Sequence, residues 1–201
     1  MSRIKLTKSE LRSQQYKFTQ LNKYLPTLQL KKSMLQSEIN ALSLEIENLV
    51  LLYQKEEDYV SEFALLLSGD DLSELFESIQ IEQVFLDKDN IAGVEFPSFK
   101  GAEFKKINYS LFTTPYWWDR AIESIQELLI AREKVRVAEE KKKALEKELR
   151  EVSIRVNLFE KILIPRSLAN IKKIKIFMGD QELASVAQAK AAKKKIMEKR
   201  G

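Results

Sequence analysis

The sequence predicts a mainly α-helical protein, a long antiparallel two-helix coiled coil with a small α+β knob in the middle of the chain. Glycine (5) and proline (4) are scarce among the 201 residues, whereas an average protein contains about 12% of the two together. A chain so poor in turn formers cannot build many short strands. Apolar residues also recur at heptad spacing toward both ends, and four of the nine glycines and prolines fall between residues 68 and 114.

Residues 1–67 are predicted to form the first long helix. Two series at seven-residue spacing run through this segment, and their members are apolar except for Thr7, Gln14 and Lys32. Heptads sustained over such a length indicate a coiled-coil seam. The first series is Ile4, Leu11, Phe18, Leu25, Lys32, Ile39, Ile46 and Tyr53, and the second is Thr7, Gln14, Leu21, Leu28, Leu35, Leu42 and Leu49.

Residues 68–114 are predicted to form the knob, with a short helix at 72–81 followed by a β-hairpin. Val94 and Phe96 alternate with polar residues as strand residues do, and a second alternating stretch occupies 107–111. Between them, residues 96–101 read Phe-Pro-Ser-Phe-Lys-Gly, a composition typical of a turn. We therefore expect the hairpin strands near 94–96 and 107–111.

Residues 115–201 are predicted to form the second long helix, which ends in a lysine-rich segment. Its apolar positions again follow helical spacing. They are Ile122, Ile125, Leu128, Leu129 and Val135, and then Leu145, Leu149, Val152, Val156, Phe159 and Leu163.

In an antiparallel pair, the numbers of facing residues add up to a constant. If both chain ends meet at one end of the pair, this sum lies between about 182 and 202. Pro26 and Pro165 add up to 191, so we expect them at one level, with a shared bend, because each removes a helix hydrogen bond. Two unrelated kinks are the alternative.

The same arithmetic places residues 49–53, which are apolar on all sides, opposite the charged segment 138–143. A helix that is apolar all round must be covered on more than one side. Another protein, the folded-back knob or a locally wide intrachain core would satisfy this requirement. The predicted partner-binding residues are Leu49, Val50, Leu51, Leu52 and Tyr53, with Val94 and Phe96 in the hairpin and Lys193, Lys194 and Lys195 near the C-terminus.

The composition excludes much enzyme chemistry. The chain contains no cysteine and no histidine, so thiolate nucleophiles, zinc ribbons and histidine bases are absent. No glycine-rich phosphate loop occurs, and the adjacent carboxylates at 56–58 and 70–71 are expected to be solvated. The pair Trp117-Trp118 is expected to pack the base of the knob, with an interface or stacking role as the alternative. We predict no catalytic residue, cofactor or metal.

Charge and hydropathy also limit the partners. A net charge of +4 does not predict nucleic-acid binding, which needs a clustered basic face. The N-terminal sequence does not resemble a signal peptide, and no apolar run is long enough to span a bilayer. We expect a cytoplasmic protein without direct membrane insertion. The lysine-rich end has four possible roles: binding acidic lipids, binding nucleic acid, forming a solvated helix end, or inserting into a partner's cavity.

Two motifs carry a family resemblance. Residues 155–166, Arg-Val-Asn-Leu-Phe-Glu-Lys-Ile-Leu-Ile-Pro-Arg, resemble the RVNALEYVVIPR-type motif of the D subunit of V-type and A-type ATPases. Its characteristic positions here are Val156, Asn157, Ile164, Pro165 and Arg166. Residues 90–99, Asn-Ile-Ala-Gly-Val-Glu-Phe-Pro-Ser-Phe, resemble that family's N-V-A-G-V-x-x-P segment, and residues 7–11 its opening.

The chain departs from the family pattern in two places. No proline precedes Thr7, and the segment after the Pro-Arg motif is poorer in Glu and Arg than is usual. Gly179 lies in that segment. A glycine within a helix costs about 1 kcal/mol relative to alanine, which predicts a weak point there.

The resemblance implies a central rotor shaft that performs no bond chemistry itself. In that family the terminal end of the coiled coil enters the catalytic head of A and B subunits. The knob end, together with the small F subunit, sits on the membrane rotor through an adaptor subunit. The complex would be peripheral to the membrane and would couple ATP turnover to ion movement. A free-standing coiled-coil scaffold or a prefoldin-like chaperone is the alternative, and the gamma shaft of F-type enzymes shares the layout but not the two motifs.

Overall fold

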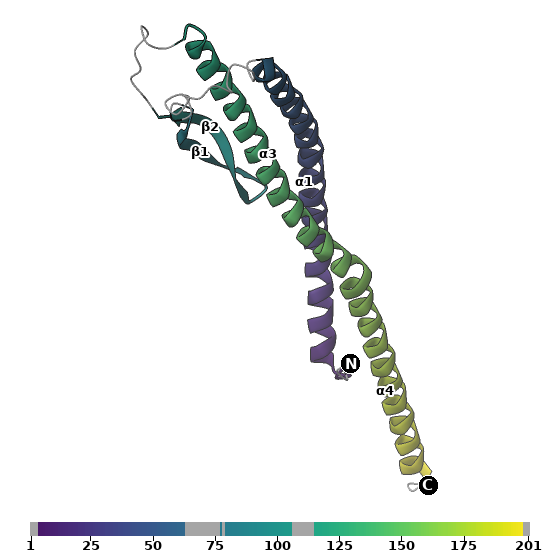
Figure 1. The fold of residues 1–201 in the computed structure, drawn as a ribbon. Coiled ribbons are helices and arrows are strands. Elements are labelled where there is room, and N and C mark those ends of the chain that lie inside the picture. The colour runs from purple at the N-terminus through teal and green to yellow at the C-terminus, as the bar shows by residue number, and fades with distance from the viewer. Residues whose placement is uncertain (1–3, 63–76, 78, 106–114, 199–201) are drawn as a thin grey trace. The chain divides into compact units, whose positions relative to one another are not determined.

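The computed structural model describes residues 4–62, 77, 79–105 and 115–198 (Figure 1). Its elements, in chain order, are α1 (Lys8–Glu62), β1 (Ile81–Ile91), β2 (Val94–Phe104), α3 (Trp118–Leu158), the π-helical turn η2 (Phe159–Leu163) and α4 (Ile164–Glu198). The predicted mainly α fold with a hairpin in the middle is confirmed. The predicted domain boundaries at residues 67 and 114, and most of the short helix at 72–81, lie outside the described residues.

The chain divides into two compact units, each with its own helix pair. One unit consists of Met1–Lys31 and Glu151–Gly201, and the other of Lys32–Arg150. Helix α1 contributes its first part to the former and its second part to the latter. We call them the terminal unit and the hairpin unit.

In the hairpin unit the predicted seam is the buried core. Leu35 of α1 and Leu145 of α3 are both 0% exposed. Arg120 Nε donates a hydrogen bond to the Tyr59 hydroxyl (3.2 Å), and Lys141 forms an ion pair with Glu38 (3.9 Å). The residue numbers in each of these pairs add up to 179, which establishes the antiparallel register.

This register corrects the expected surroundings of residues 49–53. A sum of 179 places residues 48–53 opposite 126–131, a stretch that contains Leu128, Leu129 and Ile130. The facing segment is therefore apolar, and the charged segment 138–143 lies farther along α3. The intrachain core covers one side of residues 49–53, whereas Leu51 and Leu52 remain exposed, so cover on a second side stays a prediction.

In the terminal unit the first part of α1 pairs with α4. Gln14 accepts a hydrogen bond from the side-chain amide of Asn170 (3.4 Å), and Ile171 and Ile174 of α4 are buried. Helix α4 runs without interruption through Gly179, so the predicted weak point does not break the helix.

A π-helical turn connects α3 to α4 and contains one extra residue. The backbone N–H of Ile164 bonds to the carbonyl of Phe159, five residues earlier. Pro165 follows directly and has no N–H of its own. A π-turn at this position accommodates the proline without the clash that an ideal α-helix would produce.

The extra residue also preserves the apolar seam. Regular heptad spacing after Leu163 would direct Arg166, Lys173 and Phe177 toward α1. The structure instead buries Ser167, Ile171 and Ile174 and leaves Arg166 and Lys173 exposed. The apolar series predicted for the second long helix ends at Leu163 because the spacing of the buried positions shifts by one residue at the π-helical turn.

Two expectations about the alignment of the helix pair are wrong: the shared level of the two prolines and the meeting of the two ends. The sum for Gln14 and Asn170 is 184, which displaces Pro26 and Pro165 by about seven residues, or about 10 Å along the axis. The prolines do not share a level. The described ends of the pair do not meet either, since this register places residue 4 opposite residues near 180 and the side chains of residues 180–198 are all exposed.

The hairpin lies earlier in the chain than expected. β1 pairs with β2 in antiparallel register from Ile91↔Val94 to Ile81↔Phe104. The predicted turn at residues 96–101 lies within β2, and the predicted strand at 107–111 lies outside the described residues. The actual turn is Ala92-Gly93, with φ of 52° and 82°, and the Asn90 side chain accepts a hydrogen bond from the Gly93 N–H (2.9 Å). Two positive φ values are typical of the type I′ turn that matches strand twist.

Deletion of Ile162 combined with Pro165→Ala tests the role of the extra residue. The deletion restores regular spacing through Ile164, Ser167 and Ile171, so we expect unchanged helicity and a melting temperature equal to or above that of the parent, by circular dichroism. Deletion of the exposed residue Arg155 is the control. It moves Val156 (4% exposed) out of the seam and should cost about 2–3 kcal/mol. Equal losses in both variants would contradict the role of the turn.

Candidate partner-binding surfaces

Among the residues that the structure describes, no three His, Cys, Asp or Glu side chains gather in a way that could hold a metal ion. No helix in the described part of the chain is long and apolar enough to span a membrane. The surfaces described next are those that contain the residues predicted to bind partners.

The first surface lies on the outer side of α1 in the hairpin unit. Of the five predicted residues 49–53, Leu51 and Leu52 are 56% and 52% exposed, whereas Leu49, Val50 and Tyr53 are half-buried. Leu44, seven residues before Leu51, is 63% exposed. Leu44 and Leu51 occupy the heptad position opposite the seam, where polar residues are usual. We call Leu44, Leu51 and Leu52 the outer ridge; a search of the sequence for a third heptad series would have found Leu44.

Phe96 anchors the hairpin to the helices. Its side chain is 3% exposed, and the Lys141 ammonium lies 4.8 Å from the centre of its ring. Because Lys141 also pairs with Glu38 of α1, side chains from β2, α3 and α1 meet there. The predicted contact of Phe96 with a partner is therefore replaced by a contact within the chain, while Val94 is half-buried.

A groove of about 260 Å³ remains beneath the hairpin. It is lined by Leu42, Glu45 and Leu49 of α1, by Pro97, Ser98 and Phe99 of β2, and by Lys134, Val137, Ala138 and Lys141 of α3. β1 is the more exposed strand, with Phe85 and Leu86 38% and 47% exposed. Sequence reasoning missed both of these residues because it placed no strand there.

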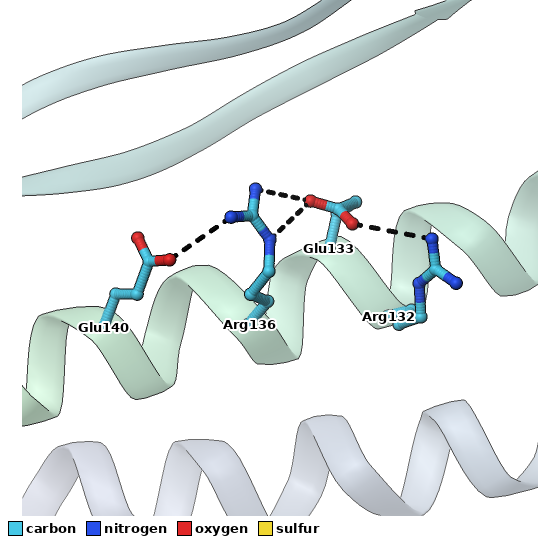
Figure 2. A network of polar contacts seen from close by, with 4 residues as sticks. All are labelled: Arg132, Glu133, Arg136 and Glu140. Atoms are coloured by element: carbon cyan, nitrogen blue, oxygen red, sulfur yellow. Dashed lines mark hydrogen bonds and ion pairs between the residues drawn. The ribbon is translucent and has the colours of Figure 1, made fainter. Parts of the chain in front are cut away.

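A charged network on α3 lies on the side of the helix where the hairpin strands run (Figure 2). Glu133 is only 7% exposed and accepts a hydrogen bond from Arg136 Nε (2.8 Å). Arg132 lies 3.8 Å from the other carboxylate oxygen, and Arg136 also pairs with Glu140 (3.2 Å). The hydrogen bond with Glu133 raises the pKa of Arg136 above its usual value. The network compensates a nearly buried carboxylate.

Aromatic packing at the start of α3 agrees with the expected role of Trp117-Trp118. Trp118 (6% exposed) and Ile122 form a buried cluster, against which Ile79, Trp117 and Ile125 pack. These two tryptophans therefore help to build the base of the knob.

The end of α4 is the third predicted surface. Lys193, Lys194 and Lys195 are exposed, in a helix whose side chains are exposed from residue 180 onward. Large apolar side chains are exposed there too, with Leu183 at 72% and Met197 at 65%. Such a helix end offers both charge and apolar area to a partner.

The family motif divides into a core position and surface positions. Val156 is buried in the seam, Ile164 is half-buried, and Asn157, Pro165 and Arg166 are exposed. Arg166 also lines a hollow of about 470 Å³ in the terminal unit. The motif thus contains both a buried seam residue, Val156, and the π-helical turn that changes the spacing of the buried positions by one residue.

Comparison with known proteins is consistent with this geometry. The family described as the D subunit of ATP synthase matches residues 10–194. The chain belongs to this family. It is 40% identical over 200 residues to the V-type ATP synthase D subunit of Chlamydia abortus, covering 99% of this chain and 96% of the relative. It is 41% identical over 198 residues to that of Chlamydia muridarum, covering 98% of both chains.

The family assignment makes the chain a subunit of a V/A-type ATPase complex. The family was predicted from two motifs, and this prediction is confirmed. The motifs that carried it, residues 90–99 and 155–166, contribute the type I′ turn and the π-helical turn of the fold.

Phe96→Ala tests the anchoring of the hairpin. Removal of a buried phenylalanine costs about 3–5 kcal/mol, so we expect hydrogen exchange of the β1 and β2 amides to accelerate strongly while the helices stay protected. Phe85→Ala removes an equal side chain from a more exposed position and should change this protection little. Equal effects of the two variants would exclude Phe96 as the anchor.

Lys100→Met tests the ion pair that crosses the hairpin. Lys100 lies 2.8 Å from Asp87, and this hydrogen bond is the main cause that lowers the pKa of Asp87 below its usual value. The pair contributes stability above the pKa of Asp87 in the unfolded chain, and the contribution disappears as pH falls through the lowered pKa. By NMR titration we expect the variant to raise the Asp87 pKa. Lys88→Met, which keeps the Lys88 backbone N–H on Asp87 (2.9 Å), should raise it less.

Proposed function

We propose that the chain is the non-catalytic central-stalk subunit of a V/A-type rotary ATPase. It would act as a rotor shaft that couples ATP hydrolysis or synthesis in the head to ion translocation across the membrane. The observation that carries the proposal is the antiparallel helix pair whose second helix continues past the start of the first, with residues 180–198 exposed. A helix end of this kind, within a family of ATP synthase subunits, is suited to insertion into a head.

The physical properties of the helices suit this role. Torque transmission needs stiff paired helices, and each of the two units contains a helix pair with buried seam residues. A shaft must also turn in its bearing without permanent adhesion. The charged and solvated end around Lys193, Lys194 and Lys195 favours contacts that exchange with water over a dry apolar interface.

Each candidate surface has a proposed partner. We assign the end of α4 to the catalytic A and B subunits, and the outer ridge, Leu44, Leu51 and Leu52, to the small F subunit. The hairpin, with Val94 and the exposed strand β1, belongs to the end that meets the membrane-rotor adaptor. The chain would then be cytoplasmic and held at the membrane through the complex.

Affinity purification of the full chain from its host tests the function. We expect the catalytic A and B subunits and the F subunit to copurify with it, together with ATPase activity. A chain that purifies alone or as a homo-oligomer would contradict the rotor role and favour a free-standing scaffold or a prefoldin-like chaperone.

The double variant Leu51→Glu/Leu52→Glu tests the outer ridge in the same experiment. Each exposed leucine covered by a partner contributes about 1.5–3 kcal/mol when fully buried, so we expect recovery of F to fall at least tenfold while A and B are retained. Leu183→Glu, at an exposed leucine of α4, is the control and should retain F. Full recovery of F with the double variant would exclude the outer ridge as its binding surface.

A further inference from the structure

The terminal unit contains a hollow of about 470 Å³ beside the π-helical turn. The beginning of α1, with the residues just before it, forms one side, and η2 and α4 form the other. The outer ridge and the hairpin belong to the hairpin unit. The hollow is therefore distinct from these two surfaces.

Buried polar side chains form part of its lining. Gln14 is 8% exposed; its amide donates to Glu10 Oε1 (2.9 Å) and accepts from Asn170 (3.4 Å). Ser167, also 8% exposed, lies beside them in the lining. The hydrogen bonds among Glu10, Gln14 and Asn170 hold this part of the lining in place. Within them, one carboxylate oxygen of Glu10 accepts a hydrogen bond from Gln14.

Three cations line the same hollow. Lys5, Lys17 and Arg166 come from three separate positions in the chain, and Glu10 is the one acidic residue among the described residues of the lining. Within the described part of the chain, none of the three cations has an ion pair within 4.0 Å. Three positive charges against one negative charge give the hollow an excess of +2, which attracts an anionic group.

The extra residue of the π-helical turn is what makes Arg166 available. Without it, regular spacing would turn Arg166 toward the seam, where burial of its charge would be costly. In the structure Arg166 is exposed and lines the hollow, while Ser167 occupies the buried position. The same turn therefore keeps the seam uncharged and provides a guanidinium that can bind a carboxylate in bidentate geometry.

We propose that this hollow binds an acidic segment of a catalytic-head subunit, with at least two carboxylates facing Arg166 and the two lysines. This inference rests on the proposed function, since it assumes that the terminal unit meets the head. A protein segment fits better than a nucleotide because the described lining residues include neither an aromatic residue for base stacking nor a glycine of a phosphate loop. Ile4 and Leu163 in the lining suit the aliphatic part of a glutamate side chain.

A labelled hexaglutamate peptide probes the site on the full chain. We expect it to bind at low ionic strength, by fluorescence anisotropy, and Arg166→Gln/Lys17→Gln to weaken binding at least tenfold. Lys161→Gln/Lys172→Gln is the matched control, since it removes the same charge from exposed positions outside the hollow, and should weaken binding less than twofold. Absent binding, or equal loss in both double variants, would overturn the site. ATP or inorganic phosphate that binds the hollow more tightly than the peptide would also overturn it, in favour of a small-anion site.

The complex separates failure of this inference from failure of the proposed function. If the parent chain copurifies with A and B, the Arg166→Gln/Lys17→Gln variant should lose them at a salt concentration that the Lys161→Gln/Lys172→Gln variant withstands. Equal salt resistance of the two variants would overturn the acidic-segment site and leave the rotor role intact. Absence of A and B from the parent chain would instead contradict the proposed function itself.

Discussion

Burial along the heptad seam is the interaction on which the rest of the structure depends. Leu35, Leu145 and Ile174 are each 0% exposed, and removal of one such side chain typically costs 2–5 kcal/mol. Helices as long as α1 (55 residues) derive little of their stability from propensity and most of it from an apolar face. Because the buried seam supplies this stability, the outer faces of the helices can present charged side chains and the outer ridge, and can pack against the hairpin.

The seam is maintained through a change of spacing and not by strict periodicity. One extra residue in η2 shifts the helix so that Ser167, Ile171 and Ile174 are buried, and Arg166 and Lys173 are exposed. Pro165 stands directly after the turn, where its missing N–H is tolerated. A residue that weakens an ordinary helix is thus placed where the hydrogen-bond pattern has already changed.

The heptad series, the mainly α fold and the family could be predicted from the sequence because each depends on local spacing. Every member of the two N-terminal series except Thr7 is buried or half-buried. The register of the pair could not be predicted, since one heptad series can slide against another by whole turns and only contacts such as Glu38–Lys141 fix it.

Sequence reasoning missed β1 because its residues Ile81–Ile91 are mostly exposed and polar, which leaves little alternation to detect. It placed a turn at Phe96–Gly101 because the composition of this segment resembles that of a turn. The hollow could not be predicted from the sequence either, because Lys5, Lys17 and Arg166 line one site only after the helices pair.

The two family motifs show why local signatures can be specific although the fold is repetitive. Coiled-coil positions tolerate exchange among apolar residues, so a seam alone says little about identity. The motif at residues 90–99 contains a two-residue turn with positive φ at Ala92 and Gly93, and the motif at 155–166 contains the π-helical turn and Pro165. Both are places where the backbone departs from its regular form, and few sequences satisfy such departures. The residues that identify this chain are therefore those that interrupt its regular elements, and one of them, Arg166, also lines the basic hollow beside the turn.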